Sequence, residues 1–111
     1  MISFRAFLVL VFLIIAGYTA VVVAHHGPDL FAVFLRDIAS LTWAGQFDLD
    51  FMCHLAVSGL WVAYRHRFGT RGVLFGMCAA VGGMLFLAPY LLVQSIRTRG
   101  DVAALLLGEN R

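Results

Sequence analysis

The stretch that decides how this chain is interpreted is TWAGQFDLDFMCH, residues Thr42–His54. It places two carboxylates and a histidine in a largely apolar run that continues to Tyr64 and ends at Arg65-His66-Arg67. A helix that crosses a bilayer needs about 20 residues. Counting back about that length from Tyr64 reaches Gln46, and we therefore predict a membrane span over about residues 47–64. Asp48 and Asp50 then lie about one turn inside its entrance, and the His54 side chain lies a turn deeper.

The composition is too apolar for a small soluble domain. Hydrophobic residues make up 62% of the 111 residues, and the mean hydropathy is +0.93. Soluble chains average about 45–50% apolar residues, and small domains bury a smaller fraction of their surface than large ones do. We therefore expect a lipid bilayer to cover the remaining apolar surface. The net charge of +2, with no basic patch interleaved with aromatic residues, predicts no nucleic-acid partner.

Two further spans are predicted on either side of residues 47–64. Residues 2–24 are long enough to cross, and their apolar run exceeds the ~7–15 residues of a signal-peptide core, so we expect a retained span. Residues 73–96 form the third predicted span, which we expect to be kinked at Pro89. Residues 29–41 are apolar on one helical face and too short to cross, which predicts an amphipathic helix at the interface.

The expected fold class is all-α: a three-helix integral membrane bundle with an interfacial helix between spans one and two. Residues 1–111 then form a single membrane domain. A short apolar tail over residues 101–108 completes it, with Asp101 as its N-cap and Gly108 at its end.

Three spans would put the N-terminus and the C-terminus on opposite sides of the membrane. The arginines on the two sides are equal in number, and the tie is broken by Arg65, Arg67 and Arg71, which share one short loop. By the positive-inside rule this loop is cytoplasmic. We therefore expect a multi-pass protein with a cytoplasmic N-terminus and a periplasmic C-terminus.

Each predicted span carries small residues at helical spacing. Membrane helices pack closely where such residues let their backbones approach. This pattern suits a compact bundle, and it equally suits docking on a larger membrane partner or a second copy of the chain. The predicted packing residues are Ala16, Ala20, Ala56, Gly59, Ala63, Gly72, Gly76, Ala80 and Gly83.

The candidate site is the pair Asp50 and His54, which stand four residues apart and share one helical face. His25 and His26 end the first span at a similar depth. Ionisable groups inside a membrane are costly and therefore suggest a function.

Three interpretations of the candidate site compete. The first is a metal site built from His25, His26, Asp50 and His54. The second is a proton or cation relay through Asp50 and His54. The third, which we favour, is structural: Asp48 caps the helix, Asp50 pairs with Arg36, and His54 hydrogen-bonds a neighbour. The sequence assigns no cofactor.

Two segments resemble a known family. They are WAGQFDLDF with SGLWVAYRH (residues 43–51 and 58–66) and GGMLFLAPYLL (residues 82–92). Together they resemble an uncharacterised bacterial family of small three-span membrane proteins, classed only as a domain of unknown function. The similarity covers about residues 29–108. It implies a bacterial inner membrane location and helical architecture, and it implies no activity.

No Gly-rich phosphate loop, nucleophile elbow or Ser/His/Asp arrangement is present in the sequence. We therefore expect a non-enzymatic protein surrounded by the lipid bilayer. The most economical role is an accessory or stabilising subunit of a larger membrane complex. The alternative is a small proton- or cation-conducting or metal-binding membrane protein that uses Asp50 and His54.

Overall fold

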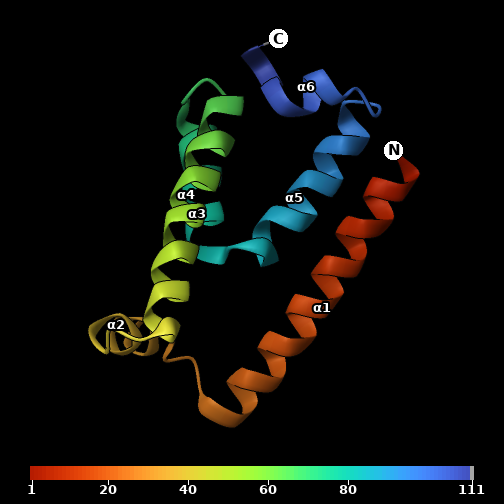
Figure 1. The fold of residues 1–111 in the computed structure, drawn as a ribbon. Helices are drawn as coiled ribbons and strands as arrows, with labels where there is room; N and C mark the ends of the chain where they lie inside the picture. Colours follow the sequence, from red (N-terminus) through yellow and green to blue (C-terminus); the bar gives the residue numbers. More distant parts are fainter. Residues whose placement is uncertain (111) are drawn as a thin grey trace.

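The computed structural model describes residues 1–110, and all of its regular structure is helical (Figure 1). A short 3-10 turn, Gly108–Asn110, follows the last helix. The helices are α1 Ile2–His26, α2 Leu30–Ala39, α3 Trp43–Arg65, α4 Thr70–Gly82, α5 Met84–Arg97 and α6 Val102–Leu107.

The all-α class is confirmed, but the three predicted spans are not. Among the described residues, α1 alone is long and apolar enough to cross a membrane by length and composition. α1 runs for 25 residues, about 37 Å, and ends at Gly27, whose φ of 77° is readily adopted only by glycine. α3 has nearly the same length, but its polar residues make it less apolar.

The predicted third span is wrong, because the helix is interrupted at Gly82-Gly83. Gly83 has φ 58°, in the left-handed region, and its N–H closes α4 by donating to the carbonyl of Ala79. The new helix α5 starts at the next residue and continues through Pro89. The main change of direction is therefore at the glycine pair, where we had expected a kink at the proline.

α4 and α5 form a hairpin that returns to the end of the molecule where it began (Figure 1). α4 runs antiparallel to α3, since Gly72 lies against His66 and Gly83 lies against Leu55. α5 then brings Tyr90 back to the end of α3, within hydrogen-bond distance of His66. Each of the two helices is only about 20 Å long, which is too short to cross a bilayer core of ~30 Å.

The interface between α3 and α4 is built on glycine. A Cβ placed on Gly76 would lie 2.6 Å from the carbonyl oxygen of Gly59, and one on Gly59 would lie 2.8 Å from that of Gly76. Gly76 also contacts the methyl group of Ala63, and Gly59 faces Ala80. The two backbones therefore touch directly, as in small-residue packing between membrane helices.

The other predicted packing residues have different surroundings. Gly72 is buried against His66, in the same interface. Ala20 and Ala56 are exposed, and Ala16 is half-buried. Gly83 ends a helix, and its Cα faces Phe51 and Leu55.

α5 connects α1 to the rest of the protein. α1 packs against α5 and, among the helices of residues 1–110, approaches no other closely. The guanidinium of Arg5 donates to the side-chain oxygen of Ser95 at 3.1 Å and to its backbone carbonyl at 2.9 Å. Met1 lies beside Gly100, so the N-terminus and α6 are at the same end of the molecule (Figure 1). The fold therefore does not support the predicted placement of the termini on opposite sides.

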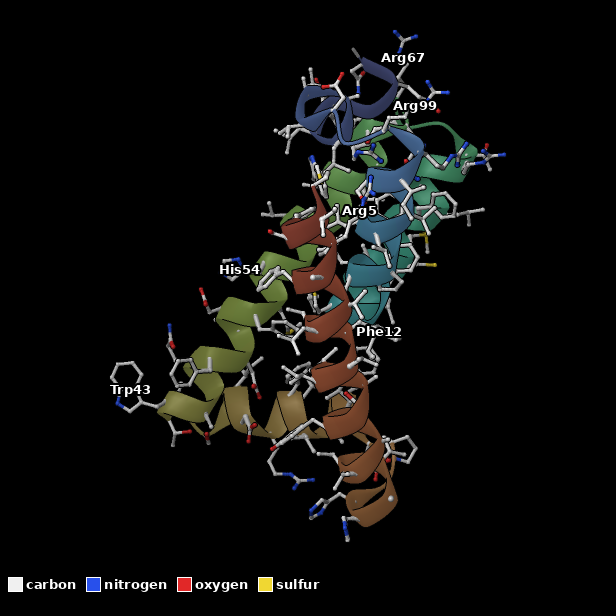
Figure 2. All side chains as sticks on the ribbon, turned by 90° about the vertical axis from the view of Figure 1, so that its right-hand side faces the viewer. Arg5, Phe12, Trp43, His54, Arg67 and Arg99 are labelled. Atoms are coloured by element: carbon white, nitrogen blue, oxygen red, sulfur yellow. The ribbon has the colours of Figure 1, made fainter. Side chains whose placement is uncertain are left out.

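α2 lies across the other end of the molecule, under the start of α3 (Figure 2). It occupies the middle of the predicted interfacial helix, and none of its side chains is buried. It meets α3 where Gly45 packs on the backbone of Asp37 and where the rings of Phe34 and Phe51 lie 6.2 Å apart.

Little of the apolar surface is buried within the chain. The core contains Val62, Ala79 and Tyr90, with Phe75 and Phe86 packed against it. Most of the large apolar side chains of α1 are exposed, and only 6% of its most apolar segment is buried. The outer surface of the protein is therefore largely hydrocarbon.

The contact between Gly59 and Gly76 predicts that one added methyl group destabilises the fold. We expect Gly76→Ala to lower the free energy of unfolding by ~1–3 kcal/mol, because the methyl would overlap the backbone of α3. Thermal unfolding in mild detergent, followed by circular dichroism, measures the change. Gly17→Ala is the matched control, because nothing lies within 4 Å of its added Cβ. Equal melting temperatures for the two variants would contradict this interface.

Candidate functional site

The structure joins the two members of the predicted polar pair. His54 Nε2 lies 3.6 Å from Asp50 Oδ2, and the two side chains are 75% and 59% exposed. His54 projects outward from the ribbon of α3 (Figure 2). The pair therefore lies on the outer surface of the chain.

The other residues of the predicted metal site are not gathered around this pair. Within residues 1–110, no three His, Cys, Asp or Glu side chains come close enough together to hold a metal ion. His25 and His26 are exposed at the end of α1, and their rings lie 6.5 Å apart.

The structural interpretation also needs correction. α3 begins at Trp43 with Thr42 at its N-cap position, so Asp48 lies within the helix and does not cap it. The Asp48 carboxyl lies beside that of Asp37 on α2. Within the described residues, the contacts at ion-pair distance are Asp50–His54 and His66–Glu109, each of which is an ion pair only when its histidine is protonated. Asp50 therefore does not pair with Arg36.

A polar row continues the Asp50–His54 pair along α3. Gln46, Asp50, His54 and Ser58 recur every fourth residue, and residues at this spacing are neighbours on a helix surface. Gln46 is exposed and Ser58 is half-buried. We refer to these four residues as the α3 polar row.

A second polar cluster was missed by the sequence reasoning, and it is buried. The side chain of Arg65, in the last turn of α3, is only 1% exposed. Its Nη1 donates to the Tyr90 hydroxyl at 2.6 Å, and its Nε donates to the Leu105 carbonyl at 2.5 Å. Its guanidinium lies over the rings of Trp61 and Tyr90, with centroid distances of 5.9 and 5.5 Å. A buried charge is tolerated when its donors are satisfied in this way.

The partners of Arg65 explain why the apolar tail folds back on the bundle. The last carbonyls of a helix have no partner within the helix, and a cation at that end is favoured by the dipole. Arg65 supplies donors to the carbonyls of Ala104 and Leu105, and the Trp61 indole donates to that of Leu106 at 3.0 Å. Two side chains of α3 thus cap the C-terminal end of α6.

Both predicted ends of the tail are confirmed. The Asp101 carboxylate accepts hydrogen bonds from the N–H groups of Ala103 and Ala104, and Gly108 follows the last helical residue. Gly108 packs on the backbone of Arg65, so a side chain at this position would collide with α3.

The hydrogen-bond chain continues from Arg65 to the surface. The Tyr90 hydroxyl accepts from Arg65, so its own proton is available to His66 Nε2, 2.7 Å away. In this arrangement the Tyr90 hydroxyl both accepts and donates, and the proton of a neutral His66 lies on Nδ1. Nδ1 is buried without a hydrogen-bond partner, and Glu109 Oε1 lies 3.5 Å from it.

Most of the positive charge lies at this end of the molecule (Figure 2). The far end, around α2 and the start of α3, carries Arg36 and four aspartates. The arginines at the end near α6 are Arg5, Arg65, Arg67, Arg71, Arg97 and Arg99. We refer to this end as the basic end.

Comparisons with known proteins give no assignment: no protein-family model, no curated protein and no solved structure matches the chain. The resemblance to the three-span bacterial family therefore stays a prediction.

The buried cluster predicts a large effect for the loss of one hydroxyl. We expect Tyr90→Phe to lower the free energy of unfolding by ~1–3 kcal/mol, because Arg65 loses an acceptor in a buried position. Denaturant unfolding followed by tryptophan fluorescence measures this loss. Tyr18→Phe removes the same atom from a side chain that is 71% exposed and serves as the control. The network is not stabilising if both variants unfold like the wild type.

Proposed function

We propose that this chain is a non-enzymatic integral membrane protein that serves as an accessory subunit of a larger membrane complex. In this proposal α1 and α3 cross the bilayer, and the α4–α5 hairpin enters from the basic end and returns to it. The observation that carries the proposal is the exposed Asp50–His54 pair on the outside of an otherwise apolar protein.

The membrane location is supported by the exposure of α1. The core helix of a soluble protein is mostly buried, whereas almost all of α1 is exposed. A cleaved signal sequence has no need of contacts with the mature chain. α1 instead makes two hydrogen bonds from Arg5 to Ser95 and buries Leu8 to 3% exposure. These contacts favour a retained helix that is surrounded by lipid or by other membrane helices.

The orientation follows from the charge distribution. The fold brings both termini and the loop between α3 and α4 to the basic end, so the arginines no longer divide equally between two sides. Short segments rich in arginine stay on the cytoplasmic side during insertion. The basic end is therefore assigned to the cytoplasm, and α2 lies at the opposite surface.

The proposed role as a subunit is supported by the depth of the α3 polar row. His54 stands midway between Trp43 and Arg65, about 17 Å from either end of α3. On insertion scales an aspartate at the centre of a membrane helix costs ~2.5–3.5 kcal/mol. Asp50 stands about 10 Å inside the start of α3, nearer its end than His54. An exposed Asp–His pair at these depths is unfavourable against lipid, and polar groups on a partner helix would offset that cost. The proposed partner is therefore another membrane protein that presents hydrogen-bonding side chains to α3.

The hairpin predicts the side on which each terminus lies. We expect reporters fused to the N-terminus and to the C-terminus to report the same compartment, the cytoplasm, because the α4–α5 hairpin does not cross. A reporter inserted at Pro28, between α1 and α2, should report the opposite side. Termini in different compartments would restore the three-span topology and contradict the hairpin.

The partner surface predicts a specific loss of association. We expect the native chain, extracted in mild detergent, to migrate in a stoichiometric complex with another membrane protein. Asp50→Asn with His54→Gln should weaken that complex about tenfold or more, through the loss of buried polar contacts. Asp29→Asn also removes a carboxylate, and it lies outside α3, so it serves as the control.

Two outcomes of this experiment would reject the accessory role. One is a monodisperse 12.2 kDa species with no associated protein. The other is an assembly that contains only copies of this chain. A cation flux in liposomes that Asp50→Asn abolishes would favour the alternative, a small conductor.

A further inference from the structure

We propose that a cavity at the basic end binds a phosphate group, carried either by a lipid headgroup or by a small soluble molecule. This inference depends on the fold of the basic end, and its lipid form rests on the proposed membrane location and orientation. It is independent of the accessory role and of the α3 polar row.

The cavity has a volume of about 180 Å³ and lies where five elements meet. Its walls come from the end of α3, the start of α4, the end of α5, α6 and the turn after α6. The polar side chains that line it are Arg65, His66, Arg71, Gln94, Arg97 and Thr98, together with Glu109.

The lining leaves two arginines available to a ligand. Arg65 is engaged with Tyr90 and the tail carbonyls. Arg71 and Arg97 are exposed, and within residues 1–110 neither forms an ion pair or a side-chain hydrogen bond. Two unpaired guanidinium groups on one small cavity favour an anion.

A buried donor adds to this positive field. His66 Nδ1 is buried and has no hydrogen-bond partner in the part of the chain that the structure describes. The Tyr90 hydroxyl occupies Nε2, which leaves the Nδ1–H available. Among the described residues, the Glu109 carboxylate, 3.5 Å from Nδ1, is the one acidic group on the cavity wall, and its side chain is 61% exposed. An anion that takes this position displaces a solvent-accessible carboxylate from the histidine.

The chemistry of the donors and the size of the cavity point to phosphate. Guanidinium groups bind phosphate oxygens through paired, charge-assisted hydrogen bonds. Basic pockets between membrane helices on the cytoplasmic side bind phospholipid headgroups in this way. The cavity is smaller than the ~300–1,000 Å³ of sites for drug-sized ligands. A single phosphate suits this volume, whereas a whole nucleotide does not.

The natural tryptophans provide a reporter for binding. Trp61 contacts the Arg65 guanidinium, and Trp43 lies at the far end of the protein (Figure 2). In a Trp43→Phe background, Trp61 fluorescence therefore follows the basic end alone. The protein in an uncharged maltoside detergent is titrated with inorganic phosphate and, separately, with short-chain phosphatidylglycerol. Sodium chloride at matched ionic strength is the blank.

We expect a saturable change in Trp61 fluorescence that the double change Arg71→Gln with Arg97→Gln weakens at least tenfold. Arg67→Gln with Arg99→Gln removes the same charge from the same end without touching the cavity, and it should leave the affinity within about twofold. Circular dichroism and melting temperature establish that both doubles are folded.

Each outcome of the titration has one meaning. Saturation by the lipid alone identifies a headgroup site, and saturation by inorganic phosphate identifies a site for a soluble phosphate. No saturable response to either ligand would overturn the proposal. Equal loss in the two double variants would also overturn it, because binding would then be a general effect of surface charge.

Discussion

The buried guanidinium of Arg65 is the constraint on which the rest of the structure depends. A charge in an apolar interior costs several kcal/mol unless its donors find acceptors. The acceptors of Arg65 come from the middle of α5 and the end of α6, which lie 25 and 40 residues further along the chain. All three elements must be in place before the charge is satisfied. The positions of α5 and the tail are therefore coupled to one side chain at the end of α3.

The glycines make that arrangement possible. Direct contact of Gly59 and Gly76 lets α4 run closely along α3, and the left-handed Gly83 turns the chain back after 13 residues. A continuous helix over the same residues would carry Tyr90 away from Arg65. Because α5 returns to the basic end, its next turn also brings Ser95 within hydrogen-bond distance of Arg5. These hydrogen bonds attach α1 to α5. The contacts of the basic end thus follow from the turn at the middle of the molecule.

The sequence predicts the helices well and the turn poorly, for a physical reason. Length, apolar pattern and the cap residues Asp101 and Gly108 act locally, so they can be seen in the sequence. A Gly-Gly pair is compatible with both a continuous membrane helix and a hairpin, and only the tertiary contacts decide between them. In the sequence, Arg65 and Arg67 mark only the end of an apolar run. No residue near Arg65 in the sequence indicates that its side chain has a buried partner. The candidate site followed the same rule: the local pair Asp50–His54 forms, whereas the distant pair with Arg36 does not.

The two polar clusters of this protein differ in burial, and their roles differ accordingly. Arg65 and Tyr90 are satisfied by the chain itself, with His66 Nε2 as a further partner of the Tyr90 hydroxyl, so this cluster holds the fold together. Asp50 and His54 contact each other and otherwise face outward from an apolar surface. Polar groups that a chain leaves unsatisfied inside a bilayer require acceptors and donors from elsewhere. The proposed surface for a partner therefore lies on α3 at the depth of His54, about 17 Å from the cluster that stabilises the monomer.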